Sequence, residues 1–424
     1  MRMRRTIAVW VSAIALLTVP CATAGEVLIP MDGIQTDHLK AYGVAYWELT
    51  QGARVDWLLN YRGGSFLCEE SAGFREECLL RGVYYEPVDA ADVASIRATI
   101  ETENMELIRL EKVPKVAIYT PPTKEPWDDA VTLALTYAEI PYATVWDTEV
   151  LAGKLAEYDW LHLHHEDFTG QFGKFYAAYR DALWYRQEKR ANEEVARALG
   201  FNKVSLLKRN VALDIREYVE QGGYLFAMCS APETIDISLS ASQTDIVPTE
   251  FDGDPPDPDC QERLDYSQSF AFTDFVVSLD PMVYEHSNID TSPQRMALVS
   301  DRGSDFFTLF EFSAKLDPVP TMLVQNHVNA VNGFMGQTTA FRSSLVKNRV
   351  IILAESPSLG EVRYLHGNFG RGTFTFYGGH DPEDYQHMVG DPPTDLEFHK
   401  SSPGYRLILN NVLFPAARKK ERKT

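Results

Sequence analysis

The sequence contains no apolar run long enough to cross a lipid bilayer as a helix. A spanning helix needs about 20 consecutive apolar residues, whereas the most apolar stretch, residues 7–19, has 13. We therefore expect no transmembrane span in the mature chain. Hydrophobic residues still make up 45% of the composition, which is typical of a chain that buries an ordinary packed core.

Basic residues are also in short supply. The chain has 40 Lys and Arg against 60 Asp and Glu, for a formal net charge of −20. Binding to nucleic acid needs a basic surface that neutralises phosphates, so we expect no nucleic-acid partner. The basic tail, residues 418–424, is the exception, and we interpret it as a solvated end. The sequence leaves the partner as an unknown small-molecule or envelope ligand.

The N-terminus has the pattern of a signal peptide. Arg2, Arg4 and Arg5 precede the apolar stretch 7–19, and the small residues Ala22 and Ala24 follow it. This order predicts cleavage near Ala24 and a periplasmic or secreted protein.

Cysteine is scarce, and five residues of this type are present in all. Removal of the predicted leader leaves Cys68, Cys78, Cys229 and Cys260. In an oxidising compartment an even number favours pairing. Disulfides Cys68–Cys78 and Cys229–Cys260 are both open at this point, and a free Cys229 is the alternative to the second.

Strands and helices alternate along most of the chain. Residues 25–111 predict a small N-terminal α/β unit with strands at 27–31, 54–61 and 82–85 and helices at 36–49 and 89–102. Residues 112–417 predict a larger α/β domain with a loop-rich insertion at about 233–348. Its strands are expected at 116–120, 143–146, 160–164, 224–228, 350–354, 362–365 and 373–377, and its helices at 127–138, 149–158, 172–221 with a break at 200–202, and 405–413. This alternation favours a mostly parallel, doubly wound sheet.

Cys229 follows an apolar strand and precedes an expected helix, with Ala227 and Ala231 on either side. A nucleophile elbow needs this strand-to-helix turn between small residues. The helix N-terminus would lower the pKa of the thiol and supply N–H groups to an oxyanion. A buried core cysteine is the alternative interpretation.

A thiol nucleophile needs a base, and His380 is the best candidate because it directly follows an expected strand and two glycines. Asp381, Glu383 or Asp384 would orient its ring. The sequence thus predicts a catalytic set of Cys229, His380 and Glu383, with Asp381 beside it.

A second cluster contains His162, His164, His165, Glu166 and Asp167. On a strand, His162 and His164 share one face, and the later residues lie at its carboxyl end, where parallel sheets bind ligands. We predict that His164, His165 and Glu166 line the pocket that contains Cys229. A transition metal is the alternative, but no spaced ligand motif is present, so we predict no metal and no cofactor.

Two loops carry weaker signals. Asp252, Asp254, Asp257 and Asp259 offer oxygen ligands for calcium, but they lack the spacing of an EF-hand, so a solvated loop is favoured. The turn 61–65 offers Arg62 and backbone N–H groups to an anion, although it fits no phosphate motif.

Two resemblances follow from these motifs. The elbow-like Cys229 with the late segment Gly379-His380-Asp381-Pro382-Glu383 resembles the class I glutamine amidotransferase-like fold over residues 115–383. That resemblance implies a Cys nucleophile at 229, a His base at 380 and an orienting Glu at 383. Over nearly its whole length the chain is similar to an exported bacterial family labelled asparagine synthetase B, through residues 27–32, 160–170 and 376–385.

The label does not imply ATP chemistry in this chain. Asparagine synthetases of that kind need an N-terminal Cys nucleophile and a Ser-Gly-Gly-x-Asp-Ser pyrophosphate loop. The mature chain would begin at Gly25, and the loop is absent. We therefore expect a Cys-dependent amide hydrolase, with a non-catalytic envelope-binding or glycan-binding module on the same fold as the alternative.

Overall fold

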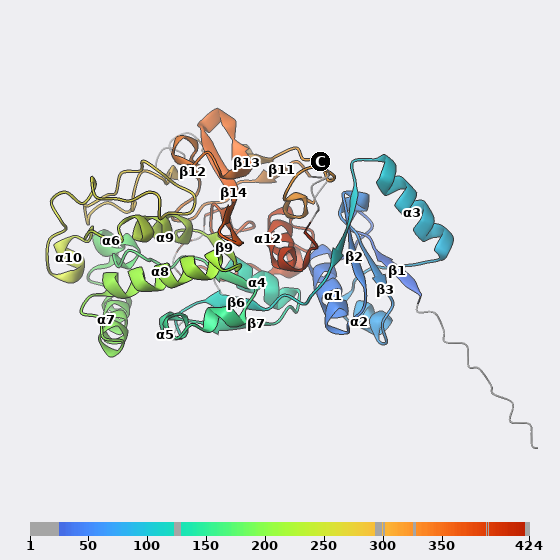
Figure 1. Cartoon of the computed structure of the whole chain (residues 1–424), viewed down its shortest axis with the longest axis horizontal. Coiled ribbons are helices and arrows are strands. Elements are labelled where there is room, and N and C mark those ends of the chain that lie inside the picture. Colours follow the sequence, from blue (N-terminus) through green and yellow to red (C-terminus); the bar gives the residue numbers. More distant parts are fainter. Residues whose placement is uncertain are drawn as a thin grey trace, which may run out of the picture.

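The computed structural model describes residues 25–122, 129–292, 299, 302–324, 328–386, 388 and 390–419. The predicted signal peptide, residues 1–24, lies outside these described residues, as does the beginning of the helix expected at 127–138. Figure 1 shows two parts: an N-terminal unit that runs to β5, and a larger body built around a second sheet.

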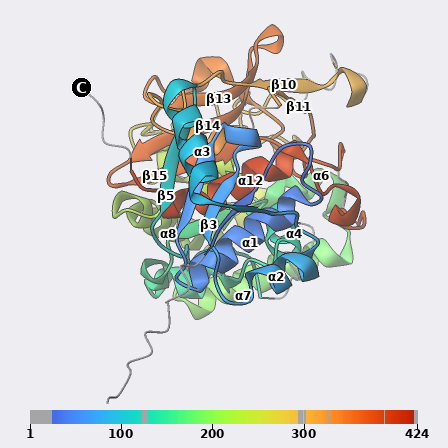
Figure 2. The same ribbon diagram turned by 90° about the vertical axis from the view of Figure 1, so that its right-hand side faces the viewer.

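The N-terminal unit is a five-stranded antiparallel sheet with helices on both faces (Figures 1 and 2). The strand order is β4-β1-β3-β2-β5. Its elements are β1 (Glu26–Ile29), α1 (His38–Thr50), β2 (Val55–Leu59), β3 (Phe66–Glu69), α2 (Phe74–Arg81), β4 (Glu86–Val88), α3 (Ala90–Thr102) and β5 (Glu106–Leu110).

Alternation along these strands divides the core of the unit into two layers. Leu28, Leu58 and Leu67 pack with the apolar side of α3, whereas their strand neighbours Val27 and Trp57 pack with α1. Successive side chains of a strand point to opposite faces, so β1, β2 and β3 contribute buried apolar side chains to both layers.

The body contains a ten-stranded mixed sheet. Along its main path the order is β11-β10-β13-β14-β15-β9-β8-β6-β7, and β12 pairs with β14. The strands are β6 (Val116–Tyr119), β7 (Tyr142–Val145), β8 (Trp160–Leu163), β9 (Tyr224–Met228), β10 (Phe306–Leu309), β11 (Ala330–Asn332), β12 (Phe341–Arg342), β13 (Ile351–Ser356), β14 (Glu361–Phe369) and β15 (Gly372–Tyr377).

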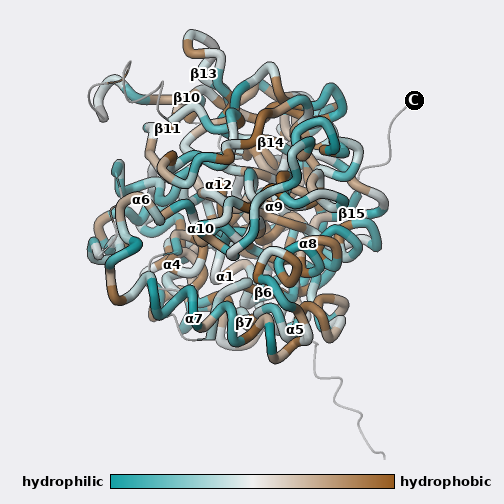
Figure 3. Tube along the Cα trace, turned by 90° about the vertical axis from the view of Figure 1, so that its left-hand side faces the viewer, coloured by the Kyte–Doolittle hydropathy of each residue, from teal (hydrophilic) through white to brown (hydrophobic). Residues whose placement is uncertain are grey.

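Helices cover both faces of the parallel part of this sheet. They are α4 (Ala130–Tyr137), α5 (Asp147–Leu151), α6 (Tyr176–Tyr179), α7 (Leu183–Ala198), α8 (Val204–Glu220), α9 (Ala231–Ser240), α10 (Thr249–Asp252) and α12 (Pro403–Leu413). One apolar core joins α4 and α12 to the sheet and continues into the N-terminal unit through α1. A second core joins α8 and α9 to the other face. Helix α7 joins the second core through Val195 and Ala196 near its C-terminal end, and its trace is mostly hydrophilic (Figure 3).

The sequence-based expectation of an α/β protein is confirmed, but the sheets are not mostly parallel. Strands β7, β6, β8, β9 and β15 run parallel, whereas β14, β13, β10 and β11 extend the sheet antiparallel. Short connections between consecutive strands explain the difference. For example, β14 and β15 are joined by the two residues Gly370 and Arg371, which are too few for the crossover that parallel strands need.

No helix among the described ranges combines the length and the apolar character that crossing a membrane requires.

Candidate functional site

Polar side chains from four places in the sequence meet at the carboxyl edge of the parallel strands. Asp129 follows β6 and caps α4, His164 and His165 follow β8, Cys229 follows β9, and His380 follows β15. Because β8, β9 and β15 are neighbours in the sheet, the segments after them lie side by side. The carboxyl edge of such a sheet is where ligands bind in open α/β folds.

Backbone hydrogen bonds hold these segments in register beyond the ends of the strands. The N–H of Cys229 donates to the carbonyl of Gly379 at 3.1 Å, and the N–H of Ala231 donates to the carbonyl of His164 at 3.1 Å. The positions of His164, Cys229 and His380 are therefore set by the sheet itself and by its first hydrogen bonds past the edge.

Three imidazoles, those of His164, His165 and His380, form what we call the histidine centre. One ring nitrogen from each lies within 4.8 Å of the others. Nε2 of His164 is 3.0 Å from Nδ1 of His380, a hydrogen-bond distance at which one of the two nitrogens donates. His164 is 1% exposed and His380 6%, so both rings are shielded from water, while His165 is partly exposed.

The carboxylate of Asp129 contacts His164 of the histidine centre and the neighbouring His162. Its carboxylate lies 3.5 Å from Nδ1 of His164 and 3.1 Å from Nε2 of His162. His162 is held in turn through Nδ1, which lies 3.1 Å from the carbonyl oxygen of Phe226. The expectation that His162 and His164 share a face of the strand is confirmed, since both reach the same carboxylate. His162 thus has protein partners at both ring nitrogens.

Burial and neighbouring charges shift the pKa values of these groups in opposite directions. Burial raises the pKa of Asp129, but the neighbouring His162 and His164 lower it further, so the net pKa lies well below its usual range. Burial lowers the pKa of His164 well below the ordinary value, which favours a neutral ring. Burial also raises the pKa of Glu166, whose carboxylate accepts the backbone N–H of His164 at 2.9 Å.

Two glycines explain how His380 reaches this position. A Cβ at Gly378 would come within 2.5 Å of the carbonyl oxygen of Thr339, and Gly379 has a φ of +103° and packs against Phe334. The loop that contains Phe334 and Thr339 can approach only because these side chains are missing. The N–H of His380 then donates to the carbonyl of Met335 in the same loop, at 2.8 Å.

The backbone at Cys229 has the conformation of a nucleophile elbow, but the pKa of its thiol is not lowered as that of an activated nucleophile would be. Its φ is +52°, and it connects β9 to α9 as expected. Burial raises the pKa of its thiol to about 12, although backbone N–H groups of Gln337, Ser230 and Thr338 directed at the sulfur partly oppose this shift. The expectation that the helix N-terminus would lower this pKa is wrong, because desolvation of the thiolate outweighs the N–H groups.

The two predicted orienting carboxylates contact other partners. Glu383 lies 3.1 Å from Nδ1 of His399. The carboxyl group of Asp381 accepts the N–H of Glu383 at 2.8 Å, and burial raises its pKa. The ring of His380 contacts the rings of His164 and His165. The catalytic set Cys229, His380 and Glu383 stays a prediction.

The two disulfides considered from the sequence are not formed. Cys68, Cys78, Cys229 and Cys260 are all free and buried. Burial raises the pKa of the Cys68 and Cys78 thiols, that of Cys78 to about 12. Cys68, Cys78 and Cys260 therefore serve as small apolar side chains of the cores.

Sequence reasoning missed three acidic residues at this edge. Asp129 is the N-cap of α4 and accepts the N–H groups of Val131 and Thr132; an Asp before an apolar helical run was the signal that could have found it. Glu233 and Asp290 are buried close together, and the burial of each raises its pKa. No local pattern pointed to that pair, because 57 residues separate its members.

The acidic loop is neutralised from within the protein. Nζ of Lys203 lies 2.7 Å from Asp245, 3.2 Å from Asp252 and 2.6 Å from Asp254. A lysine ammonium therefore occupies the position that a calcium ion would take. The sequence favoured a solvated loop, whereas two of its carboxylates, those of Asp252 and Asp254, pair with Lys203 within the protein.

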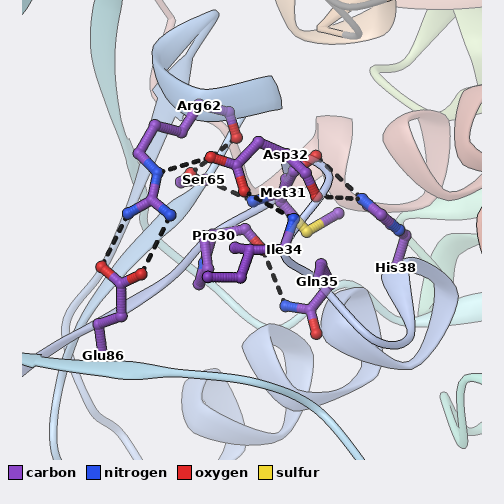
Figure 4. A network of polar contacts seen from close by, with 9 residues as sticks. All are labelled: Pro30, Met31, Asp32, Ile34, Gln35, His38, Arg62, Ser65 and Glu86. Carbon is purple, nitrogen blue, oxygen red and sulfur yellow. Dashed lines mark hydrogen bonds and ion pairs between the residues drawn. The ribbon is translucent and has the colours of Figure 1, made fainter.

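The charged side chain of the turn at residues 61–65 is likewise paired with groups of the protein itself (Figure 4). The guanidinium of Arg62 donates to Asp32 at 2.7 Å and to both carboxylate oxygens of Glu86, at 2.7 and 3.0 Å. Nε2 of His38 lies 3.0 Å from the carbonyl oxygens of Met31 and Asp32. These pairings hold β1, the turn and β4 together, and leave Arg62 with two carboxylates in place of the anion considered from the sequence.

The comparisons with known proteins supply no name. No family model matches the chain, and no curated protein matches it. Two solved structures from Salmonella typhimurium are similar over 72% of this chain and 100% of their own. Cytoplasmic Protein STM3548 has 11% identity and a TM-score of 0.35, and Cytoplasmic Protein STM1381 from strain LT2 has 10% and 0.33. At these scores neither supports an argument about activity.

One prediction is nevertheless corrected. Both structures are named as cytoplasmic proteins, which contradicts the periplasmic or secreted location expected from the sequence. An apolar run of 13 residues after basic residues is a short pattern, and runs of that length also occur in segments with other roles. No compartment follows for this chain from structures of such low similarity.

Proposed function

We propose that this protein is a hydrolase whose reaction takes place at the histidine centre. The observation that carries the proposal is the 3.0 Å approach of Nε2 of His164 to Nδ1 of His380, between residues 216 positions apart in the sequence. Buried imidazoles cost free energy that apolar side chains would not. Two of them side by side, backed by a carboxylate, indicate a role in chemistry rather than in packing.

In this proposal a water molecule is the nucleophile and is activated at the His164–His380 pair. Asp129 keeps His164 in one orientation, as a carboxylate does for the histidine of other hydrolytic sites. His165, the most exposed of the three imidazoles, would contact an arriving substrate. The substrate class we favour is an amide, which is what the resemblance of residues 115–383 to the class I glutamine amidotransferase-like fold implies.

A second candidate uses the thiol of Cys229 as the nucleophile. It is favoured by the left-handed backbone at Cys229 and by three backbone N–H groups directed at its sulfur, the arrangement that would hold a developing anion. The raised thiol pKa and the pairing of His380 with His164 place this candidate second. It is the mechanism that the resemblance to the class I glutamine amidotransferase-like fold implies, with Cys229 as the nucleophile and His380 as the base.

The test compares variants on amide substrates. Release of ammonia from glutamine and asparagine, and of p-nitroaniline from aminoacyl p-nitroanilides, would be measured for the wild type and for His380→Ala and Cys229→Ser. Loss of a positioned acid–base group costs about 10²- to 10⁴-fold in rate. We expect a loss of that size in His380→Ala and less than a ten-fold loss in Cys229→Ser.

A loss of the same size in Cys229→Ser would support the thiol mechanism, in which His380 serves as the base. Hydrolysis that is unchanged in His380→Ala would refute the proposed function. Far-ultraviolet circular dichroism and thermal unfolding of each variant separate loss of activity from loss of folding.

A further inference from the structure

The donor set of the histidine centre matches a metal site. Among side-chain groups, imidazole nitrogens are the ligands preferred by zinc and by several other transition metals. His164, His165 and His380 each direct one nitrogen toward the others within 4.8 Å. In addition, Nδ1 of His165 is buried without a hydrogen-bond partner among the described residues. Buried polar atoms normally have a partner, so a buried ring nitrogen without one points to a bound ligand or ion.

We propose that His164, His165 and His380 bind one divalent transition-metal ion of the zinc class. The separation of the nitrogens fits. With metal–nitrogen bonds of about 2.0–2.1 Å, two ligands lie roughly 2.9 Å apart at a right angle and roughly 3.3 Å apart at a tetrahedral angle. The observed 3.0 Å between Nε2 of His164 and Nδ1 of His380 falls inside this range. A metal ion bound by both lone pairs takes the place of the proton that the two nitrogens otherwise share.

The surroundings of His164 are those of a metal ligand. A ligating histidine usually directs its other ring nitrogen at a carboxylate, which fixes the tautomer. Here Nδ1 of His164 lies 3.5 Å from Asp129, which leaves Nε2 for the centre. His162 contacts the same carboxylate and the carbonyl of Phe226, and so it holds Asp129 in place rather than binding the ion itself.

The two other groupings of metal-ligand residues on the described chain are less suitable. In the grouping of Asp129 with His162 and His164, both nitrogens of His162 already have protein partners. In the grouping of Asp245 with Asp252 and Asp254, Nζ of Lys203 lies among the carboxylates. Of the three groupings on the described residues, only the histidine centre consists of imidazoles alone.

Three protein ligands leave a coordination position for water, which is the arrangement of catalytic zinc sites. Such an ion lowers the pKa of its bound water to about 7 and so makes a nucleophile at neutral pH. The inference deepens the proposed function by naming how water is activated at the His164–His380 pair. It does not require hydrolysis to be correct, because metal binding is measured without a substrate.

The experiment uses the full chain, stripped of metal with dipicolinate and titrated with Zn²⁺ by calorimetry and with Co²⁺ by visible absorption. We expect one equivalent of Zn²⁺ and a Co²⁺ spectrum typical of nitrogen ligands in a low-symmetry site. His165→Ala and His380→Ala should each weaken Zn²⁺ binding at least about 100-fold, and Asp129→Asn about 10- to 100-fold. His399→Gln, a partly exposed histidine outside the centre, is the matched control and should leave binding unchanged.

Binding of less than a quarter of an equivalent by the wild type, or binding equally tight in His165→Ala and His380→Ala, would overturn the metal site. Metal binding without hydrolysis of any amide would refute the proposed function alone. Hydrolysis that depends on His380 but survives removal of metal would refute the metal inference alone.

Discussion

Asp129 has two separable tasks, and a pair of substitutions can measure each. Its Oδ1 accepts the backbone N–H groups of Val131 and Thr132, which caps helix α4, and the same oxygen lies 3.1 Å from Nε2 of His162. Asp129→Asn keeps an oxygen in this place and removes only the charge. Asp129→Ala removes both the cap and the partner of His162.

The expected magnitudes follow from these contacts. Loss of an N-cap costs about 1 kcal/mol, and loss of a buried hydrogen bond to a charged group costs about 1.5–3 kcal/mol. Asp129→Ala should therefore lower the free energy of unfolding by about 3 kcal/mol. Asp129→Asn exchanges a charged for a neutral hydrogen bond and should cost about 1 kcal/mol.

The assay is urea unfolding at pH 7 followed by tryptophan fluorescence and circular dichroism. Asp89 provides the matched control, since it caps α3 through the N–H groups of Ala91 and Asp92 and is exposed. Asp89→Ala should cost about 1 kcal/mol and Asp89→Asn close to nothing. If Asp129→Asn is as destabilising as Asp129→Ala, or if both cost less than 0.5 kcal/mol on this roughly 3 kcal/mol scale, the two-task reasoning is wrong.

Four further outcomes are expected. Iodoacetamide should alkylate Cys229 in the folded protein at pH 8 roughly a thousand-fold more slowly than in urea, because burial raises its pKa to about 12; mass spectrometry of the digested protein would show this, and rapid native labelling would contradict it. Burial lowers the pKa of His366 to about 3, so the unfolded state binds a proton below about 6.5 that the folded state does not. Stability is therefore lost as pH falls from 6.5 to 3, and His366→Asn should reduce that loss by up to about 1.4 kcal/mol per pH unit in urea titrations. Lys203→Met should lower the midpoint of thermal unfolding by leaving three carboxylates unneutralised, and millimolar Ca²⁺ should restore part of it; no response to Ca²⁺ would mean that the oxygens do not converge. Gly336→Ala, whose Cβ would come within 2.8 Å of the backbone nitrogen of His380, should weaken Zn²⁺ binding more than it lowers stability, whereas unchanged binding would show that the loop moves aside.

Local patterns predicted much of the architecture. The strands at β6, β8, β9 and β15 and the helices α8 and α12 lie where apolar runs and periodicity placed them. Asp37 caps α1, with its side chain accepting the N–H of Lys40. These elements depend on neighbours within a few residues, which is why the chain alone indicates them.

Other elements were not predicted from the sequence because distant parts of the chain determine their structure. The strands β3 and β5 were not predicted, since their residues take their state from pairing with β1 and β2 across the sheet. The helix α2 was not predicted either. The antiparallel strands β10 and β11 lie in the region expected to be an irregular insertion, because short strands at a sheet edge carry little periodicity.

The sequence by itself determined which residue types stand at the ends of the strands: histidines after β8 and β15, and a cysteine after β9. Only the tertiary structure decided how they combine. It brought His380 within hydrogen-bond distance of His164, placed Asp129 beside His164, and raised the pKa of Cys229 by burying it. The physical reason is that partnership and desolvation depend on strand order, and strand order is set by packing between segments hundreds of residues apart.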